Sequence, residues 1–81
     1  MKAPRIAKRY YRELRSEMAL RGLRQADIAK VLGRSVNYVD RIMAGHGSFL
    51  VREAVEIIQF LELDEQDFVR LFVRDIDSAA A

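Results

Sequence analysis

Residues 25–45, QADIAKVLGRSVNYVDRIMAG, are the stretch that decides the fold. Their apolar side chains form two sets at helical spacing, one on each side of Gly33. The sets are Ile28, Ala29 and Leu32, and then Val39, Ile42 and Met43. Gly33 can take the positive φ that follows a helix end, and Ser35 can cap the next helix by accepting a backbone hydrogen bond. The pattern therefore predicts two short helices, about 25–32 and 36–44, joined by a tight turn.

This pair is a predicted helix-turn-helix, and its sequence resembles the Cro/Xre-type helix-turn-helix of phage repressors and small bacterial transcriptional regulators. The residues that carry the resemblance are Gln25, Ile28, Ala29, Leu32, Gly33, Ser35, Asn37, Tyr38, Val39, Arg41, Ile42 and Gly45. It extends from about Leu14 to Phe72. The chain departs from the family pattern at Arg24 and Leu50, where a capping Thr or Ser is common, and at Arg34, where an apolar residue is usual.

The resemblance implies an all-α fold: a compact, lambda-repressor-like bundle of five helices with the helix-turn-helix at its second and third. It also implies sequence-specific binding to a double-stranded DNA operator and a role in transcription regulation as a phage-like repressor. A chain of 81 residues makes one small domain, predicted here as residues 1–74 followed by a frayed tail, 75–81.

Composition narrows the classes of protein. Hydrophobic residues make up 51% of the chain, which argues against disorder. The absence of cysteine excludes disulfides and thiolate metal sites and fits a reducing compartment. The first residues lack the apolar run of a signal peptide, and no stretch reaches the roughly 18 apolar residues that would span a bilayer. We therefore expect a cytoplasmic protein without a membrane partner.

Charge is divided unevenly between the two halves of the chain. Residues 1–41 carry eleven Lys or Arg and four Asp or Glu, a net charge of +7, whereas residues 42–81 carry three and eight, a net charge of −5. A basic half that contains the predicted helix-turn-helix suits phosphate contact, and the acidic half should face away from DNA. A charge run is more often only a solvated face, but its coincidence with the helix-turn-helix favours DNA.

Three further helices are predicted around this pair. The first begins near Pro4, ends at Gly22 and buries a stripe of Ile6, Tyr10, Leu14 and Met18. The second covers about 51–61, with Val51, Ala54, Val55, Ile58 and Leu61 on its inner face and with Ile57 and Phe60 widening that face. The third covers about 65–73, is capped by Asp64 and carries more apolar residues than one stripe needs. Phe68, Leu71 and Phe72 are therefore a candidate homodimer contact, with burial inside the chain an equal alternative.

The second helix of such a motif presents its N-terminal residues to base edges in the major groove. The candidate base-reading residues are Ser35, Val36, Asn37, Asp40, Arg41 and Ala44. Asn37 suits adenine, Arg41 suits guanine or a phosphate, and Val36 suits a thymine methyl group. Asp40 would accept from cytosine, orient Arg34 or Arg41, or stay solvated.

Phosphate contacts are predicted for a second set of residues: Gln25, Arg34, Tyr38, His46 and Ser48. Gln25 opens a helix whose N-terminus attracts anions. Arg34 is either a phosphate clamp or a surface charge, and Tyr38 either reaches a phosphate or is partly buried. The basic residues Lys2, Arg5, Lys8 and Arg9 either reach the backbone or solubilise the first helix.

No enzyme is expected, because no nucleophile–base pair, cofactor motif or metal cluster is visible. A lone His46 without cysteine cannot build a zinc site. The acidic residues 53–67 lack the spacing of a calcium loop. Two alternatives to an operator-binding regulator remain: an antitoxin-like protein whose acidic, apolar C-terminal half binds a protein partner, and an adaptor that has lost DNA binding.

Overall fold

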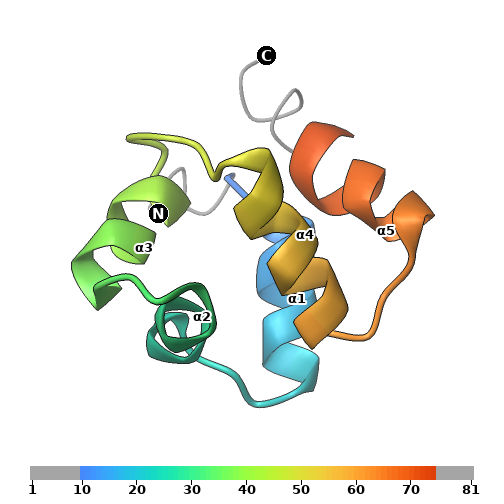
Figure 1. The fold of residues 1–81 in the computed structure, drawn as a ribbon. Coiled ribbons are helices and arrows are strands. Elements are labelled where there is room, and N and C mark those ends of the chain that lie inside the picture. Colours follow the sequence, from blue (N-terminus) through green and yellow to red (C-terminus); the bar gives the residue numbers. More distant parts are fainter. Residues whose placement is uncertain (1–9, 75–81) are drawn as a thin grey trace, which may run out of the picture.

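The computed structural model describes residues 10–74, and every element in this range is helical. The elements are α1 (Arg12–Leu20), α2 (Gln25–Leu32), α3 (Val36–Met43), α4 (Val51–Phe60) and α5 (Glu65–Val69), which continues into a π-helical segment (Arg70–Arg74). In Figure 1, α4 lies centrally, with α2 and α3 on one side and α5 on the other. For the described residues, the predicted all-α bundle of five helices is confirmed.

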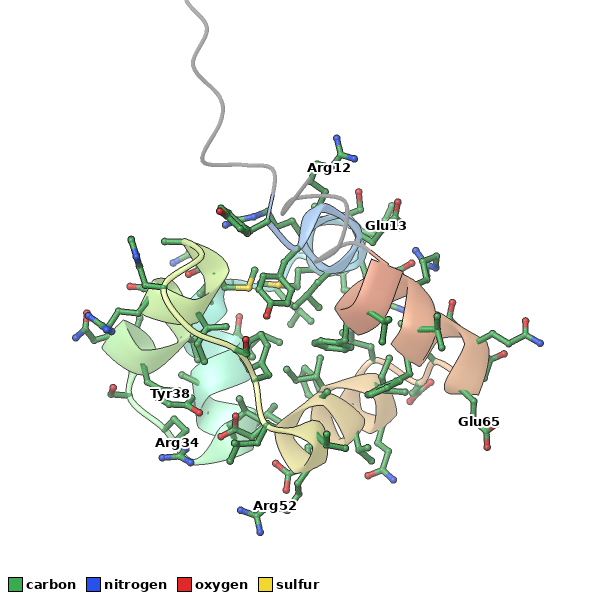
Figure 2. All side chains as sticks on the ribbon, turned by 90° about the horizontal axis from the view of Figure 1, so that it is seen from above. Arg12, Glu13, Arg34, Tyr38, Arg52 and Glu65 are labelled. Atoms are coloured by element: carbon green, nitrogen blue, oxygen red, sulfur yellow. The ribbon has the colours of Figure 1, made fainter. Side chains whose placement is uncertain are left out.

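The core lies where these helices converge. Seen from above, α1, α5, α4 and the α2–α3 pair surround a common centre that is filled by apolar side chains (Figure 2). Three aromatic rings meet edge to face within it: the ring centroid of Phe49 lies 5.4 Å from that of Tyr11 and 5.9 Å from that of Phe72. Such pairs add stability beyond that of buried area. Residues from the N-terminal, middle and C-terminal parts of the chain therefore share one core.

The first helix begins later than the sequence predicts. Tyr11 has a φ of 55° and a ψ of 40°, a left-handed conformation that interrupts any helix running from Pro4 to Gly22. The break places Tyr11 in the core, where it is only 2% exposed, and leaves Tyr10 half-buried. The stripe is therefore correct at Leu14 and Met18, and Tyr10 is only partly buried at the edge of the core. Pro4 and Ile6 lie outside the described residues.

The fourth helix is rotated relative to the predicted inner face. Ile57, expected at the margin of that face, is completely buried, whereas Val51 is 73% exposed and Val55 is 40% exposed. The predicted positions Ala54, Ile58 and Leu61 are buried as expected. The inner face therefore follows Ala54, Ile57, Ile58 and Leu61, which leaves the two valines in contact with solvent.

The last helical segment is divided between core and surface. Leu71 and Phe72 are buried inside the chain, and Phe68 is half-buried. Leu71 and Phe72 are therefore not available to a second copy in this conformation; of the two alternatives, burial within the chain is the one observed for them.

Within residues 10–74, no helix has both the length and the apolar character needed to cross a bilayer.

Candidate nucleic-acid interface

The turn between α2 and α3 is built by local hydrogen bonds. Gly33 has a φ of 68°, and the amides of Gly33 and Arg34 donate to the carbonyls of Lys30 and Ala29 at 3.2 and 2.9 Å. The Ser35 hydroxyl then accepts from the Tyr38 amide at 3.1 Å, which caps α3. These contacts confirm the predicted roles of Gly33 and Ser35 and fix where α3 begins.

One face of α3 is buried and the other is open to solvent. Val39, Ile42 and Met43 pack into the core. The exposed residues of α3 and its two flanking caps are Ser35, Val36, Asn37, Asp40, Arg41 and Ala44. All six candidate base-reading residues therefore lie on the solvent side.

Within residues 10–74, the side chains of Asn37, Asp40 and Arg41 form no hydrogen bond or ion pair. The alternative in which Asp40 pairs with Arg34 or Arg41 is therefore absent from this conformation, because Arg34 pairs with Glu53 and Arg41 is unpaired. Of the alternatives for Asp40, orientation of an arginine is wrong for this conformation. Asn37 and Arg41 keep their full hydrogen-bonding capacity for a ligand.

The N-terminus of α2 is capped from inside its own first turn. The Asp27 carboxylate accepts from the Arg24 amide at 2.8 Å, while the Arg24 side chain makes no capping bond. Gln25 opens the helix and is half-buried. Arg24 stands where a capping Thr or Ser is common, and Asp27 supplies a capping hydrogen bond in its place. The helix therefore begins where the sequence predicts.

A buried carboxylate joins the turn, α3 and α4. Glu53 is 3% exposed, and its two oxygens accept from the Tyr38 hydroxyl at 2.8 and 3.0 Å and from the Leu50 amide at 3.0 Å. The Arg34 Nε lies 3.0 Å from Glu53 Oε2, and the Arg34 guanidinium carbon lies 4.5 Å from the centroid of the Tyr38 ring. We call the side chains of Glu53, Tyr38 and Arg34 the Glu53 network (Figure 2 labels Arg34 and Tyr38).

This network fixes the charge of Glu53. Burial on its own raises the pKa of the carboxyl, but the hydrogen bonds from the Leu50 amide, Tyr38 and Arg34 outweigh it and hold the pKa below its usual range. The bond to Glu53 also raises the pKa of the Tyr38 hydroxyl. Glu53 is thus an anion inside the protein, compensated by three donors.

Two predicted phosphate contacts are changed by this arrangement. The Tyr38 hydroxyl is already engaged by Glu53, so partial burial rather than phosphate contact describes it. Arg34 is not a plain surface charge, because it is held on one side by Glu53.

His46 and Ser48 are exposed in the loop between α3 and α4. Lys2, Arg5, Lys8 and Arg9 lie outside the described residues.

Sequence reasoning missed three residues of this region. Glu53 was grouped with the acidic residues, although its place three positions after a Leu without a capping oxygen is a capping signal. Arg15 donates from Nη2 to the Met43 carbonyl at 2.6 Å and so ties α1 to the C-terminal end of α3. Arg52, in the exposed first turn of α4, points to the same side of the molecule as Arg34 (Figure 2).

A second surface lies between α4 and α5. Its apolar lining consists of Val51, Val55, Ile58, Leu63 and Phe68, and Gln59, Asp64 and Glu65 supply its polar part. It is a shallow apolar groove with two acidic residues at its edge. In residues 10–74, no group of three His, Asp or Glu side chains is arranged to hold a metal ion.

Compared with known protein families, curated proteins and solved structures, the chain matches none. Interpretation of these surfaces therefore depends on their geometry and chemistry.

Proposed function

We propose that this chain binds double-stranded DNA through a helix-turn-helix formed by α2 and α3, as a Cro/Xre-like transcriptional regulator. The observation that carries the proposal is the open face of α3, where Asn37 and Arg41 are exposed and unpaired within residues 10–74, directly after a capped helix start. Side chains with unused donors on the exposed face of a helix suit base edges in the major groove.

Affinity would come from phosphate neutralisation and sequence preference from α3. Arg34 and Arg52 lie on one side of the molecule (Figure 2), and Gln25 opens α2. These groups suit contacts to backbone oxygens, which position a protein without reading sequence. Asn37 pairs best with adenine and Arg41 with guanine. Asp40 carries the opposite charge, and on this face its carboxylate would accept a hydrogen bond from a cytosine amino group.

The test is selection of bound sequences from a random duplex library with the full chain, at about 50 and 200 mM salt. We expect an enriched consensus and an affinity that falls steeply with salt. A palindromic consensus would indicate two copies on a two-fold site. If neither salt concentration gives enrichment, the proposal is wrong.

A pair of variants then tests the assignment of α3. Arg41→Ala should weaken binding to the selected site by roughly 1–3 kcal/mol and relax the preference at one position. Lys30→Ala removes the same charge from the exposed side of α2 and should leave the sequence preference unchanged. Equal preference profiles for the two variants would contradict a reading role for Arg41.

The groove between α4 and α5 supports a second candidate function, an antitoxin-like or adaptor role. It combines five apolar side chains with Asp64 and Glu65, so it suits a basic amphipathic partner. Co-purification of the tagged chain with a small basic protein, lost in Val55→Asp but retained in Lys30→Ala, would support this function. Absence of DNA enrichment together with such a partner would favour it over operator binding.

A further inference from the structure

The Glu53 network holds the guanidinium of Arg34 by one nitrogen and one face. Nε donates to Glu53 Oε2 at 3.0 Å, and the Tyr38 ring lies beneath the guanidinium carbon at 4.5 Å. Within residues 10–74, the two terminal nitrogens, Nη1 and Nη2, make no hydrogen bond. The Arg34 side chain is 41% exposed, whereas that of Glu53 is 4% exposed. The bound edge of the guanidinium therefore faces the protein, and the unbound terminal nitrogens remain for solvent.

We propose that Arg34 is a pre-oriented binding group for a DNA backbone phosphate, and that Glu53 and Tyr38 are the residues that position it. The proposal rests on the proposed function, because the ligand is the phosphodiester of a bound duplex. It assigns Glu53 a role in DNA binding although this carboxylate has the same sign of charge as the DNA.

The chemistry of guanidinium fits this division of roles. The group is planar and always charged, and it offers several N–H donors in fixed directions, so anchoring one nitrogen fixes the direction of the others. Pairs of N–H groups match the spacing of phosphate oxygens. Stacking on an aromatic ring restricts rotation out of the plane. Glu53 and Tyr38 together thus hold the guanidinium plane before a ligand arrives.

The position of Arg34 in the fold places these donors beside the reading helix. Arg34 lies between Gly33, which ends α2, and Ser35, which caps α3. Glu53 and Leu50 belong to the start of α4, so the network also fixes α3 against α4. A phosphate bound by Arg34 would consequently set the register of α3 along the duplex.

The sign of one substitution separates positioning from plain electrostatics. Glu53→Gln removes a negative charge, so if only net charge matters, duplex binding must tighten. If Glu53 positions Arg34, binding must weaken instead, because one amide oxygen cannot serve the Leu50 amide, Tyr38 and Arg34, and the amide NH₂ faces other donors. Glu65→Gln is the matched control, since Glu65 lies at the start of α5, on the far side of the molecule from Arg34 and Tyr38 (Figure 2).

The experiment is a double-mutant cycle on duplex affinity with the full chain and its selected site, measured by fluorescence anisotropy at several salt concentrations. The variants are Arg34→Ala, Glu53→Gln and the double variant, with Glu65→Gln and Lys30→Ala as controls. All are compared at a temperature where circular dichroism shows them folded. A salt series is included because each lost phosphate contact reduces the slope of log K against log salt by about 1.

The expected result is a loss of about tenfold in affinity and a smaller salt slope for Arg34→Ala. Glu53→Gln should lose about threefold in the wild-type background and nothing in the Arg34→Ala background, because the two residues act through one contact. Equal losses in both backgrounds would mean that Glu53 only stabilises the fold, and tighter binding in both would mean that only its charge matters; each overturns the positioning role. Failure of the wild type to bind any duplex overturns the proposed function itself.

A measurement without DNA checks the held state directly. In ¹⁵N–¹H spectra of the arginine side chains, the Arg34 Nε–H should exchange slowly with water in the wild type and faster in Glu53→Gln. Unchanged exchange in the variant would contradict the hydrogen bond on which the positioning depends.

Discussion

Arg34 and Arg70 sit in two charged networks of opposite character. Every guanidinium nitrogen of Arg70 is engaged: Nε and Nη2 donate to Asp67, Nη1 to Glu13 and Nη2 also to Glu17, at 2.5–3.3 Å. Arg34 uses Nε alone and leaves its terminal nitrogens without a partner among residues 10–74. The Arg70 network fastens the C-terminal segment to α1, whereas the Glu53 network fastens the turn, α3 and α4.

The difference shows how two arginines can be distinguished without a bound ligand. The Arg70 guanidinium gives four of its five N–H groups to three carboxylates, so it has one donor left for an anion, and the local acidic charge would repel a phosphate. A guanidinium that is held only at Nε by a buried carboxylate keeps its two terminal nitrogens, Nη1 and Nη2, for an anion. The Arg70 network is therefore structural, and the Glu53 network is the one with capacity for function.

Acid should break both networks at once and so give the largest effect. The hydrogen bonds of Arg21 and Arg70 lower the pKa of Glu17, those of Arg70 and the Asp64 amide lower the pKa of Asp67, and the pKa of Glu53 is lowered despite burial. Because these folded-state pKa values lie below the unfolded ones, their stabilisation is complete above about pH 4–5 and is lost as the pH falls through the folded values.

Urea unfolding as a function of pH measures this loss. The free energy of unfolding should be nearly constant from neutral pH down to about pH 5 and then fall. Glu53→Gln should show a shallower fall, because the variant has one fewer carboxylate to protonate. An unfolding free energy that rises on acidification would contradict the assigned directions of the pKa shifts.

Glu53→Ala should be the most damaging single substitution in these networks, at about 2–4 kcal/mol of unfolding free energy. It leaves the Leu50 amide, the Tyr38 hydroxyl and Arg34 without their shared acceptor. Chemical denaturation with an unchanged m-value checks the effect. A loss below that of Arg70→Met would reverse the ranking of the two networks.

Arg70→Met keeps the apolar stem and removes the charge, and should cost about 1 kcal/mol, because the partners are partly exposed. In about 1 M salt, where the screening length is near 3 Å, this cost should shrink. Duplex binding should be unaffected, in contrast to Arg34→Ala. A duplex affinity reduced as much as by Arg34→Ala would mean that Arg70 also serves the interface.

Tyr38→Phe should have the smallest effect, below that of Arg70→Met, because one neutral donor is lost while the ring beneath Arg34 remains. Thermal unfolding measures the cost. A cost equal to that of Glu53→Ala would imply that the hydroxyl, rather than the carboxylate, organises the network.

Local signals accounted for much of the fold. Gly33 and Ser35 act through backbone conformation and a cap within three residues, so α2 and the start of α3 could be predicted. Asp64 is similar: its carboxylate accepts from the Gln66 and Asp67 amides, as expected of a cap. The six exposed residues of the α3 face also follow from periodicity alone.

Features that depend on distant partners escaped prediction. Helical spacing does not distinguish Tyr10 from Tyr11 as a core residue. Tyr11 is the one that enters the core, because its ring contacts Phe49 and Phe72. Glu53 is buried because Arg34, from the turn between α2 and α3, and Tyr38, from α3, supply donors to it. No rule of sequence spacing predicts such pairings. The sequence therefore identified Arg34 as a charged residue but not as one that Glu53 and Tyr38 hold in place.

The glycine that closes the α3 region limits how this chain can vary. At Gly45, with a φ of 94°, an added Cβ would lie 2.6 Å from Tyr10 Cε2, in a conformation that other residues rarely adopt. At Gly47, the added atom would meet only Ile42, at an ordinary 3.5 Å. Two glycines that look alike in the sequence thus differ in the substitutions they tolerate: position 47 has room for a Cβ, whereas at position 45 a side chain would strain the backbone and displace Tyr10.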